Sequence, residues 1–491
     1  MIDLPVGPTT TPRFAKLLWH GAIYSGGIVA GKVAGLLFLP VVARRLGPES
    51  FGRLDLLSAF FSAVVATLIF GLDSATTRLY PEASAHERKS MFATWLALAF
   101  LALAGFNAGM LALRRPLAGL MLDNSDLGME VATTGLAISG ALLLLIVLTV
   151  LRNEARPELY AVLSGGSAVL SACLVAAGML WRPSVGLALT AQGFAASVFA
   201  FVGLVIVRRS LTARPNPALF NRMLRIGLPL APAAAMVTVG DLAIRTMLLR
   251  LGDANEVGFL SLSVRLGSIV LVLVVALQTA WQPRVFALIK RSGGGFIIAT
   301  DARRIVSLVA MSSFSLAVLA PILVRVIGGR SFGEAAVSGG WMLVAALGQG
   351  VFQVVAIGPA LNKRLGVIAW GTLLAVVVAV AVTSVLAGRF GASGAAVGLA
   401  CGQWLAVVAV ASNRSTQALP LPIGVIARTS LLASAAIILV TFPGRSVWSV
   451  AVGVIAIVMA IVSDGSAADG RALLAGWWTG VVRGSQRDDV S

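Results

Sequence analysis

The chain has 491 residues, of which 58% are hydrophobic and only 12% are charged, and its mean hydropathy is +0.94. A soluble globular protein carries about 25% charged residues, so the composition predicts a polytopic membrane protein and excludes a soluble enzyme. The net charge of +18 is typical of Lys and Arg on cytoplasmic loops, and no soluble basic domain is present that would bind nucleic acid.

The apolar runs predict an all-α membrane protein with about 14 transmembrane helices. They are about 20 residues long and do not alternate, which excludes the short strands of a membrane β-barrel. The first run resembles a signal peptide, but its length and Lys32 favour a retained span. The predicted spans cover residues 14–42, 51–80, 90–113, 131–151, 159–180, 185–207, 219–249, 257–288, 305–327, 335–361, 365–386, 392–411, 421–442 and 447–462.

The spans group into two six-helix lobes and a terminal helix pair. With both termini cytoplasmic, that side holds about 22 Lys and Arg residues against about 11 on the other side. No connector on the outer side is long enough for a catalytic domain, so we expect a transporter and not an enzyme. The predicted domains are a flexible tail (1–12), an N-lobe (13–207), a basic cytoplasmic linker (208–217), a C-lobe (218–411), spans 13 and 14 (412–462) and a cytoplasmic tail (463–491).

A repeated pattern supports two halves. Arg-Leu-Gly followed by an apolar residue and Gly occurs at 45–52 and again at 250–258, about 205 residues later. Val-Gly-Leu-Ala occurs at 185–188 and at 397–400, at the similar offset of about 212 residues. A parallel repeat predicts two lobes related by an axis along the membrane normal, with a transport site between them.

Almost every charge deep inside an apolar run lies on spans one, two, seven or eight. Such charges cost several kcal/mol in lipid, so they normally face a protein-lined or watery cavity. The pattern predicts one cationic central cavity lined by these four spans. The charges are Lys32, Asp73, Arg78, Asp241, Arg245, Arg265 and Arg284.

Several of these charges have a second interpretation. Lys32 lies too deep for easy snorkelling, whereas Arg78 and Arg284 could mark cytoplasmic span ends. Asp241 and Arg245 are one helical turn apart, so they could form a structural ion pair or serve substrate binding and coupling. Asp73 could carry a coupling ion or pair with Arg78 or Lys32.

Other polar and reactive residues suggest weaker sites. Four glutamines and Trp281 could contact sugar, but interhelical hydrogen bonds are the commoner use of such glutamines, and an interfacial position is at least as consistent for the tryptophan. Cys173 and Cys401 lie in apolar runs and are expected to be packing residues. No metal site is predicted, because the two histidines have no cluster of ligand residues around them. The glutamines are Gln278, Gln282, Gln349 and Gln353.

Two segments resemble a known family. Residues 43–82, ARRLGPESFGRLDLLSAFFSAVVATLIFGLDSATTRLYPE, resemble the opening hairpin of the polysaccharide transporter family. Residues 225–274 resemble the same family's seventh and eighth spans, with a Gly-x-Pro, a buried Asp and a Leu-Gly turn. The family contains the Wzx-type flippases of O-antigen and capsule units, within the multidrug/oligosaccharidyl-lipid/polysaccharide exporter superfamily. Many members have Asp directly before Arg in span seven, whereas Asp241 and Arg245 are four residues apart.

The resemblance implies a flippase of the bacterial inner membrane, with both termini cytoplasmic. It would move a polyprenyl-pyrophosphate-linked oligosaccharide to the outer face by alternating access, for O-antigen or exopolysaccharide biosynthesis. Arg binds phosphate oxygens bidentately, which suits this cargo. The predicted pyrophosphate ligands are Lys32, Arg78, Arg245, Arg265 and Arg284, and the candidates for H⁺ or Na⁺ coupling are Asp73 and Asp241.

Partners and alternatives follow from the same interpretation. The expected partners are the lipid-linked oligosaccharide, membrane lipid, and the polymerase and other polysaccharide assembly proteins. One alternative is a multidrug-type cation antiporter of the same superfamily, although deep basic groups outnumber acids and only 7% of residues are aromatic. A second alternative is a non-transporting membrane scaffold of envelope synthesis, which would need no buried charges.

Overall fold

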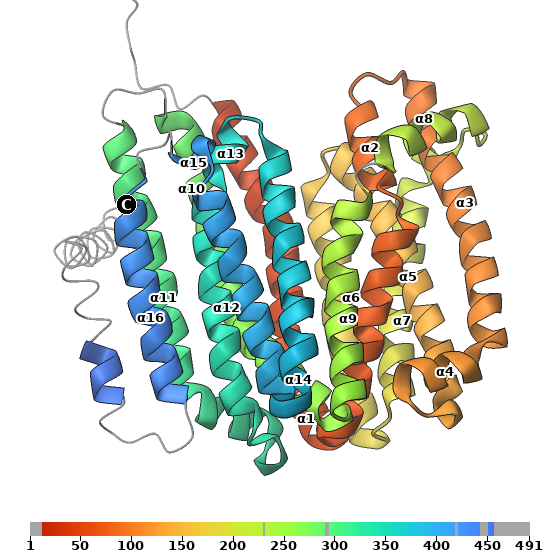
Figure 1. Cartoon of the computed structure of the whole chain (residues 1–491). Coiled ribbons are helices and arrows are strands. Elements are labelled where there is room, and N and C mark those ends of the chain that lie inside the picture. Colours follow the sequence, from red (N-terminus) through yellow and green to blue (C-terminus); the bar gives the residue numbers. More distant parts are fainter. Residues whose placement is uncertain (1–11, 229–230, 290–293, 418–420, 442–449, 456–491) are drawn as a thin grey trace, which may run out of the picture. The chain divides into compact units, whose positions relative to one another are not determined.

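The computed structural model describes residues 12–228, 231–289, 294–417, 421–441 and 450–455 (Figure 1). Within these ranges all regular structure is helical and no strand occurs, which confirms the all-α prediction. Two compact units divide the chain, Met1–Leu249 and Arg250–Ser491. The predicted tails and most of the predicted fourteenth span lie outside the described residues, and the predicted lobe boundaries stay a prediction.

Unit 1 is a helical bundle in which glycines let backbones approach. A Cβ on Gly193 of α7 would lie 2.9 Å from Ala137 Cα, and one on Gly140 of α5 would lie 2.8 Å from the Gly193 carbonyl oxygen. Small residues at such crossings suit helix packing in lipid. Its helices are α1 (Pro12–Leu68), α2 (Leu72–Leu79), α3 (Ala85–Ala112), α4 (Arg114–Leu122), α5 (Gly128–Asn153), α6 (Pro157–Trp181), α7 (Val185–Val207), α8 (Pro217–Gly227) and α9 (Ala231–Leu251), which ends just inside unit 2.

The first two predicted spans are continuous in α1. The helix turns at Gly47, whose φ of 71° and ψ of 172° lie outside the helical region. Glycine adopts a positive φ without steric cost, and the following Pro48 disfavours helical geometry at the preceding residue. The prediction that the second span continues to residue 80 is wrong, because the chain breaks at Phe70 and Gly71, both with positive φ.

The predicted seventh span is also broken. Two prolines predicted a bend there, and α8 ends at Gly227 while α9 begins at Ala231. The two breaks touch: a Cβ on Gly227 would lie 2.7 Å from the Phe70 carbonyl oxygen, and one on Gly71 would overlap the Gly227 carbonyl. Two interrupted helices of unit 1 therefore meet backbone to backbone.

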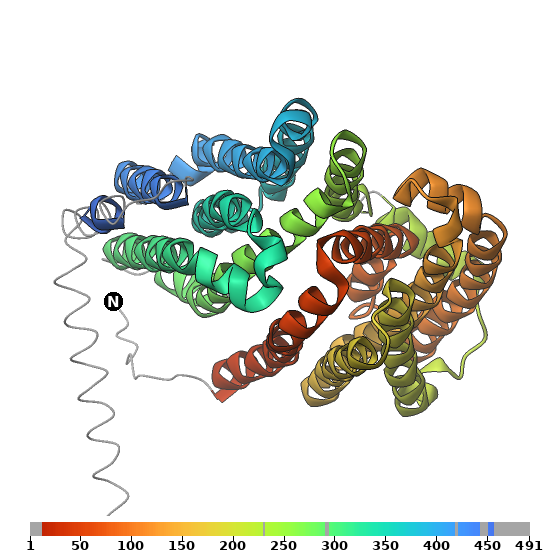
Figure 2. The ribbon, with the colours of Figure 1, turned by 90° about the horizontal axis from the view of Figure 1, so that it is seen from below.

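Unit 2 contains a long hairpin formed by one helix. In Figure 2, α14 and α16 form a layer beside α10, α11 and α12. α14 turns at Gly391 (φ 50°, ψ −132°), and the Ala392 backbone N–H donates to Glu256 Oε2 at 2.5 Å. The helices are α10 (Ala254–Leu288), α11 (Gly294–Gly328), α12 (Ala335–Val355), α13 (Ile357–Leu361), α14 (Leu365–Ala411), α15 (Arg414–Gln417) and α16 (Ile423–Thr441).

Ten helices in the described ranges are long and apolar enough to cross a membrane. Two of them, in α1 and α14, are 40 and 47 residues long and are divided by the glycine turns into two helices each. α9 has 21 residues and forms the second part of the predicted seventh span. The result agrees with the prediction of about 14 spans and a multi-pass membrane protein.

Candidate functional site

A buried charge cluster joins α1 to α9 in unit 1. Arg245 on α9 donates through Nε to Asp55 Oδ2 on α1 at 2.5 Å, and through Nη1 to Asp241 Oδ1 one turn earlier on α9. Arg245 is 5% exposed and Asp55 is 9% exposed, whereas 42% of the Asp241 side chain is accessible. The cluster thus has one face inside the bundle and one carboxylate that reaches its surface.

The charge of this cluster differs from the predicted cationic cavity. One guanidinium faces two carboxylates, so the group is net negative when all three are ionised. A buried guanidinium needs such partners, because an unpaired charge in a low-dielectric interior is very costly. The role of Arg245 in pyrophosphate binding stays a prediction, and it requires Arg245 to leave at least one of its aspartates.

The pairing of Asp241 with Arg245 is one of the two interpretations that the sequence allowed, and Asp55 was missed. Residues four apart on a helix share one face, which makes the first pair visible from spacing. Asp55 lies close to the start of the predicted second span, where charges are ordinary. The signal available in the sequence is that Asp55 lies among the leucines Leu54, Leu56 and Leu57. All three are buried in the structure, so the helix is already inside the bundle at this point.

The other predicted residues of unit 1 do not join this cluster. Lys32 is exposed on α1 and Arg78 is exposed in the last turn of α2. Asp73 is half-buried in the first turn of α2, and among the described residues it forms no ion pair with Lys32 or Arg78. Lys32 and Arg78 therefore remain accessible cations, as a binding role would require.

The two predicted cations of unit 2 both lie on α10 and are exposed. Arg284 pairs with Asp301 of α11, with 3.1 Å between Nε and Oδ2. Gln278 donates to Gln353 Oε1 at 2.8 Å, so this pair makes the interhelical hydrogen bond. Trp281 is buried in the core of unit 2 and lines a small pocket with Gln278, Gln282 and Gln353, so its contact with sugar stays a prediction.

The cysteines differ from expectation as well. Cys173 and Cys401 are exposed free thiols on α6 and α14, so the prediction that they are packing residues is wrong. In the part of the chain that the structure describes, no group of three or more His, Cys, Asp or Glu residues could hold a metal ion.

Solved structures of membrane transporters share this fold. The lipid II flippase MurJ in an inward closed conformation matches with a TM-score of 0.71 at 13% identity, covering 92% of this chain and 99% of that one. The MATE multidrug transporter DinF-BH matches with a TM-score of 0.52 at 16% identity, covering 85% and 99%. An outward-facing multidrug resistance transporter of the MATE family and MOP superfamily gives 0.53 at 16% identity, covering 80% and 93%.

A search of curated proteins found no match. A family model, described as polysaccharide biosynthesis protein, matches residues 18–289, which is more than half of the chain. The matched range includes every predicted pyrophosphate ligand and ion-coupling candidate, and Asp55. These findings agree with the resemblance of the two hairpins, and the chain belongs to this polysaccharide biosynthesis family of multi-pass membrane proteins.

Proposed function

We propose that the protein flips a polyprenyl-pyrophosphate-linked oligosaccharide from the cytoplasmic to the outer face of the bacterial inner membrane, for surface polysaccharide biosynthesis. The family match over residues 18–289 carries the proposal, because it spans all the helices that bear deep charges. The MurJ-like fold supports it, since that protein is described as a lipid II flippase. Alternating access between the two faces is part of the proposal.

The accessible cations supply the chemistry of substrate binding. A pyrophosphate cannot be solvated by lipid tails, and Lys or Arg in a protected site stabilises it. Lys32, Arg78 and Arg265 are exposed, which suits this role, and Arg265 has other interactions within the protein. Arg284 would first have to share its charge with Asp301, so we assign it the weaker contribution.

The buried cluster would couple transport to an ion gradient. Asp241 is the accessible member, so H⁺ or Na⁺ could reach its carboxylate. Neutralising that carboxylate removes one of the two charges that hold Arg245. A less tightly held Arg245 would then be available to the pyrophosphate, which links ion binding to cargo binding. Asp73, half-buried on α2, is the second coupling candidate.

The test is the location of lipid-linked saccharide in cells that lack the protein. We expect a complete unit to accumulate on the cytoplasmic face and surface polysaccharide to be lost. Re-expression of the wild type should restore export, and so should the Arg182→Ala control, which removes an exposed cation at the end of α6. Normal intermediates and normal surface polymer, in a strain with no second flippase, would contradict the proposal.

A second candidate is a cation antiporter of the multidrug type. The net negative charge of the Arg245 cluster favours it, because an organic cation would be attracted where a pyrophosphate is repelled. The same deletion strain separates the two functions. Normal surface polymer together with hypersensitivity to organic cations would support the antiporter, whereas loss of polymer at unchanged drug sensitivity would support the flippase.

A further inference from the structure

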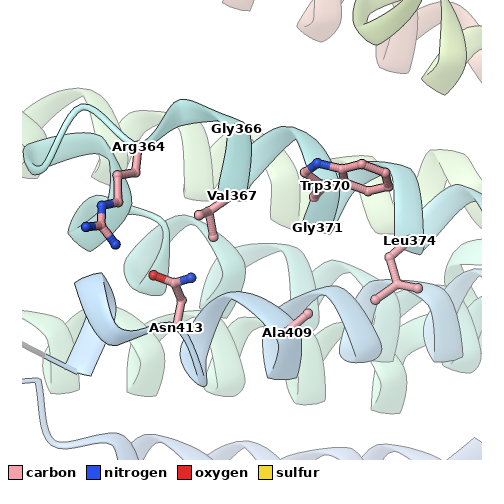
Figure 3. A pocket seen from close by; sticks show the side chains of 8 residues that line it. All are labelled: Arg364, Gly366, Val367, Trp370, Gly371, Leu374, Ala409 and Asn413. Carbon is pink, nitrogen blue, oxygen red and sulfur yellow. The ribbon is translucent and has the colours of Figure 1, made fainter.

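A pocket of about 620 Å³ lies along the hairpin of α14 in unit 2 (Figure 3). Because α14 turns at Gly391, its first residues lie beside its last ones, and both lengths line the pocket. The two arms of the hairpin are close at Gly371, which lines the pocket: a Cβ there would lie 2.7 Å from Val410 Cγ2. None of the predicted transport residues lines this pocket.

One end of the pocket is polar and basic. Figure 3 shows the Arg364 guanidinium and the Asn413 amide at this end, extending from opposite arms of the hairpin. Arg364 forms no ion pair with any residue in the described ranges. Its backbone is fixed by a turn, in which Lys363 has a φ of 56° and the Arg364 N–H donates to the Pro359 carbonyl oxygen at 2.8 Å.

The residues that flank α14 carry charge of one sign. Lys363 and Arg364 precede α14, Arg414 begins α15 just after it, and the sequence contains no Asp or Glu between Glu334 and Asp464. Neither arm of the hairpin can therefore neutralise Arg364. A cation without a partner at the edge of a membrane helix attracts anionic headgroups, with Arg suited to bidentate phosphate binding.

The rest of the pocket is apolar. Gly371 and Ala409 line it. A Cβ added to Gly366 would meet no other atom of the described residues within 4 Å. Trp370, 71% exposed, and Leu374 lie farther along the groove (Figure 3). Leu365, Leu405 and Val408 on the same helix are exposed as well. Within a membrane such a surface is covered by hydrocarbon, so the occupant must join an anionic head to an apolar chain.

We propose that this pocket binds an anionic bilayer phospholipid. Its phosphate contacts the Arg364 guanidinium and the Asn413 amide, and one acyl chain lies over Gly366 and Gly371 against Trp370. The lipid bridges the two arms of the α14 hairpin. This site is separate from the transport residues, so it stands whether the cargo is a lipid-linked sugar or a drug.

The test uses the full-length protein in vesicles of equimolar phosphatidylglycerol and phosphatidylcholine. A trace of either lipid carries a photoreactive diazirine on its acyl chain, and labelled peptides are mapped by mass spectrometry. We expect the phosphatidylglycerol probe to label residues 365–374 and 405–413 about tenfold more than the phosphatidylcholine probe. A tenfold ratio is about the difference in affinity that one charge-assisted hydrogen bond supplies. Arg364→Gln should reduce this preference to none, and Arg364→Lys should retain part of it.

Two further variants separate the pocket from the surrounding surface. Gly366→Leu adds an apolar side chain at a position where a Cβ has no atom within 4 Å, so it should abolish labelling while the protein stays folded. Arg389→Gln removes an exposed cation from the same helix and should change nothing. Equal labelling by both probes, or full preference in Arg364→Gln, would overturn the proposal. Displacement by inorganic phosphate would instead indicate a small-anion site, and displacement by an equal mole fraction of polyprenyl diphosphate a cargo site; either result refutes the assignment.

Discussion

Arg245 is the residue whose role the structure changes most. The sequence suggested a cation for an anionic cargo, with a structural pair to Asp241 as the alternative, and in the structure its guanidinium is held by both Asp55 and Asp241. A buried ion pair contributes little net stability compared with an apolar core, yet removing one partner leaves a buried charge that nothing compensates. Arg245 must therefore be tested for folding before it is tested for transport.

The first prediction concerns this cluster. Arg245→Ala should destabilise the protein by about 3–5 kcal/mol, because Asp55 would be left buried and unpaired. Thermal unfolding in detergent, followed by gel filtration, would measure the loss. Arg250→Ala, an exposed cation near the end of α9, should unfold like the wild type. A second variant, Arg245→Gln with Asp55→Asn, should recover much of the stability; equal stability of Arg245→Ala and wild type would contradict the structural role.

At the scale of elements, the break in the second span is fixed by a contact with α8. Gly71 has a φ of 67°, and its backbone lies against Gly227 at the end of the interrupted α8. Neither glycine has room for a side chain. The two breaks are therefore matched, and a change in one of them must be accommodated by the other.

We accordingly predict that Gly71→Ala destabilises unit 1 by about 1–2 kcal/mol or more. The left-handed backbone conformation is unfavourable for alanine, and its methyl group would overlap the Gly227 carbonyl. Gly105→Ala is the matched control, because that site on α3 is helical and open. The midpoint of thermal unfolding should fall for the first variant and stay level or rise for the second. The same midpoint for both would mean that the backbone contact is not maintained in the membrane.

The turn of α14 leads to a third prediction. Gly391→Ala combines a positive φ with overlap between the new methyl and the Glu256 carboxylate, so it should cost about 1–2 kcal/mol or more. Glu256→Gln keeps the acceptor oxygen for the Ala392 N–H and should cost less. Gly388→Ala, three residues away and open, serves as the control. An unchanged midpoint of thermal unfolding in Gly391→Ala would contradict the positive φ and the close contact with Glu256 at this turn.

At the scale of the whole molecule, apolar runs made most of the fold predictable. Run length alone predicts an all-helical membrane protein with about 14 spans, because lipid forces each run to satisfy its own backbone hydrogen bonds. The break at Phe70 was not predictable, since a phenylalanine rarely adopts a positive φ and only the contact with α8 requires it. The ion pair between Asp55 and Arg245 joins residues 190 positions apart, and no local sequence pattern indicates a contact over that distance.

The fourth prediction concerns cargo binding. Lys32 on α1 and Arg265 on α10 are both exposed. If each contributes a contact to pyrophosphate, Lys32→Ala and Arg265→Ala should each reduce export about tenfold, the value of one charge-assisted hydrogen bond, while amounts of folded protein stay normal. Surface polysaccharide in the complemented deletion strain is the readout. Full activity of both variants would remove the cationic site from the mechanism.

The glycine turns of α1 and α14 determine how the topology of this protein can be mapped. Each passes from one span to the next at a single residue, Gly47 or Gly391, so neither leaves a loop. Proteases cleave exposed, extended chain, and cleavage of intact cells would miss both turns whichever side they face. A membrane-impermeant maleimide reacts with a single accessible cysteine. Labelling of Glu49→Cys and Arg389→Cys in intact cells would therefore report the side of the membrane on which each turn lies. Cys173 and Cys401, both exposed, must first be replaced.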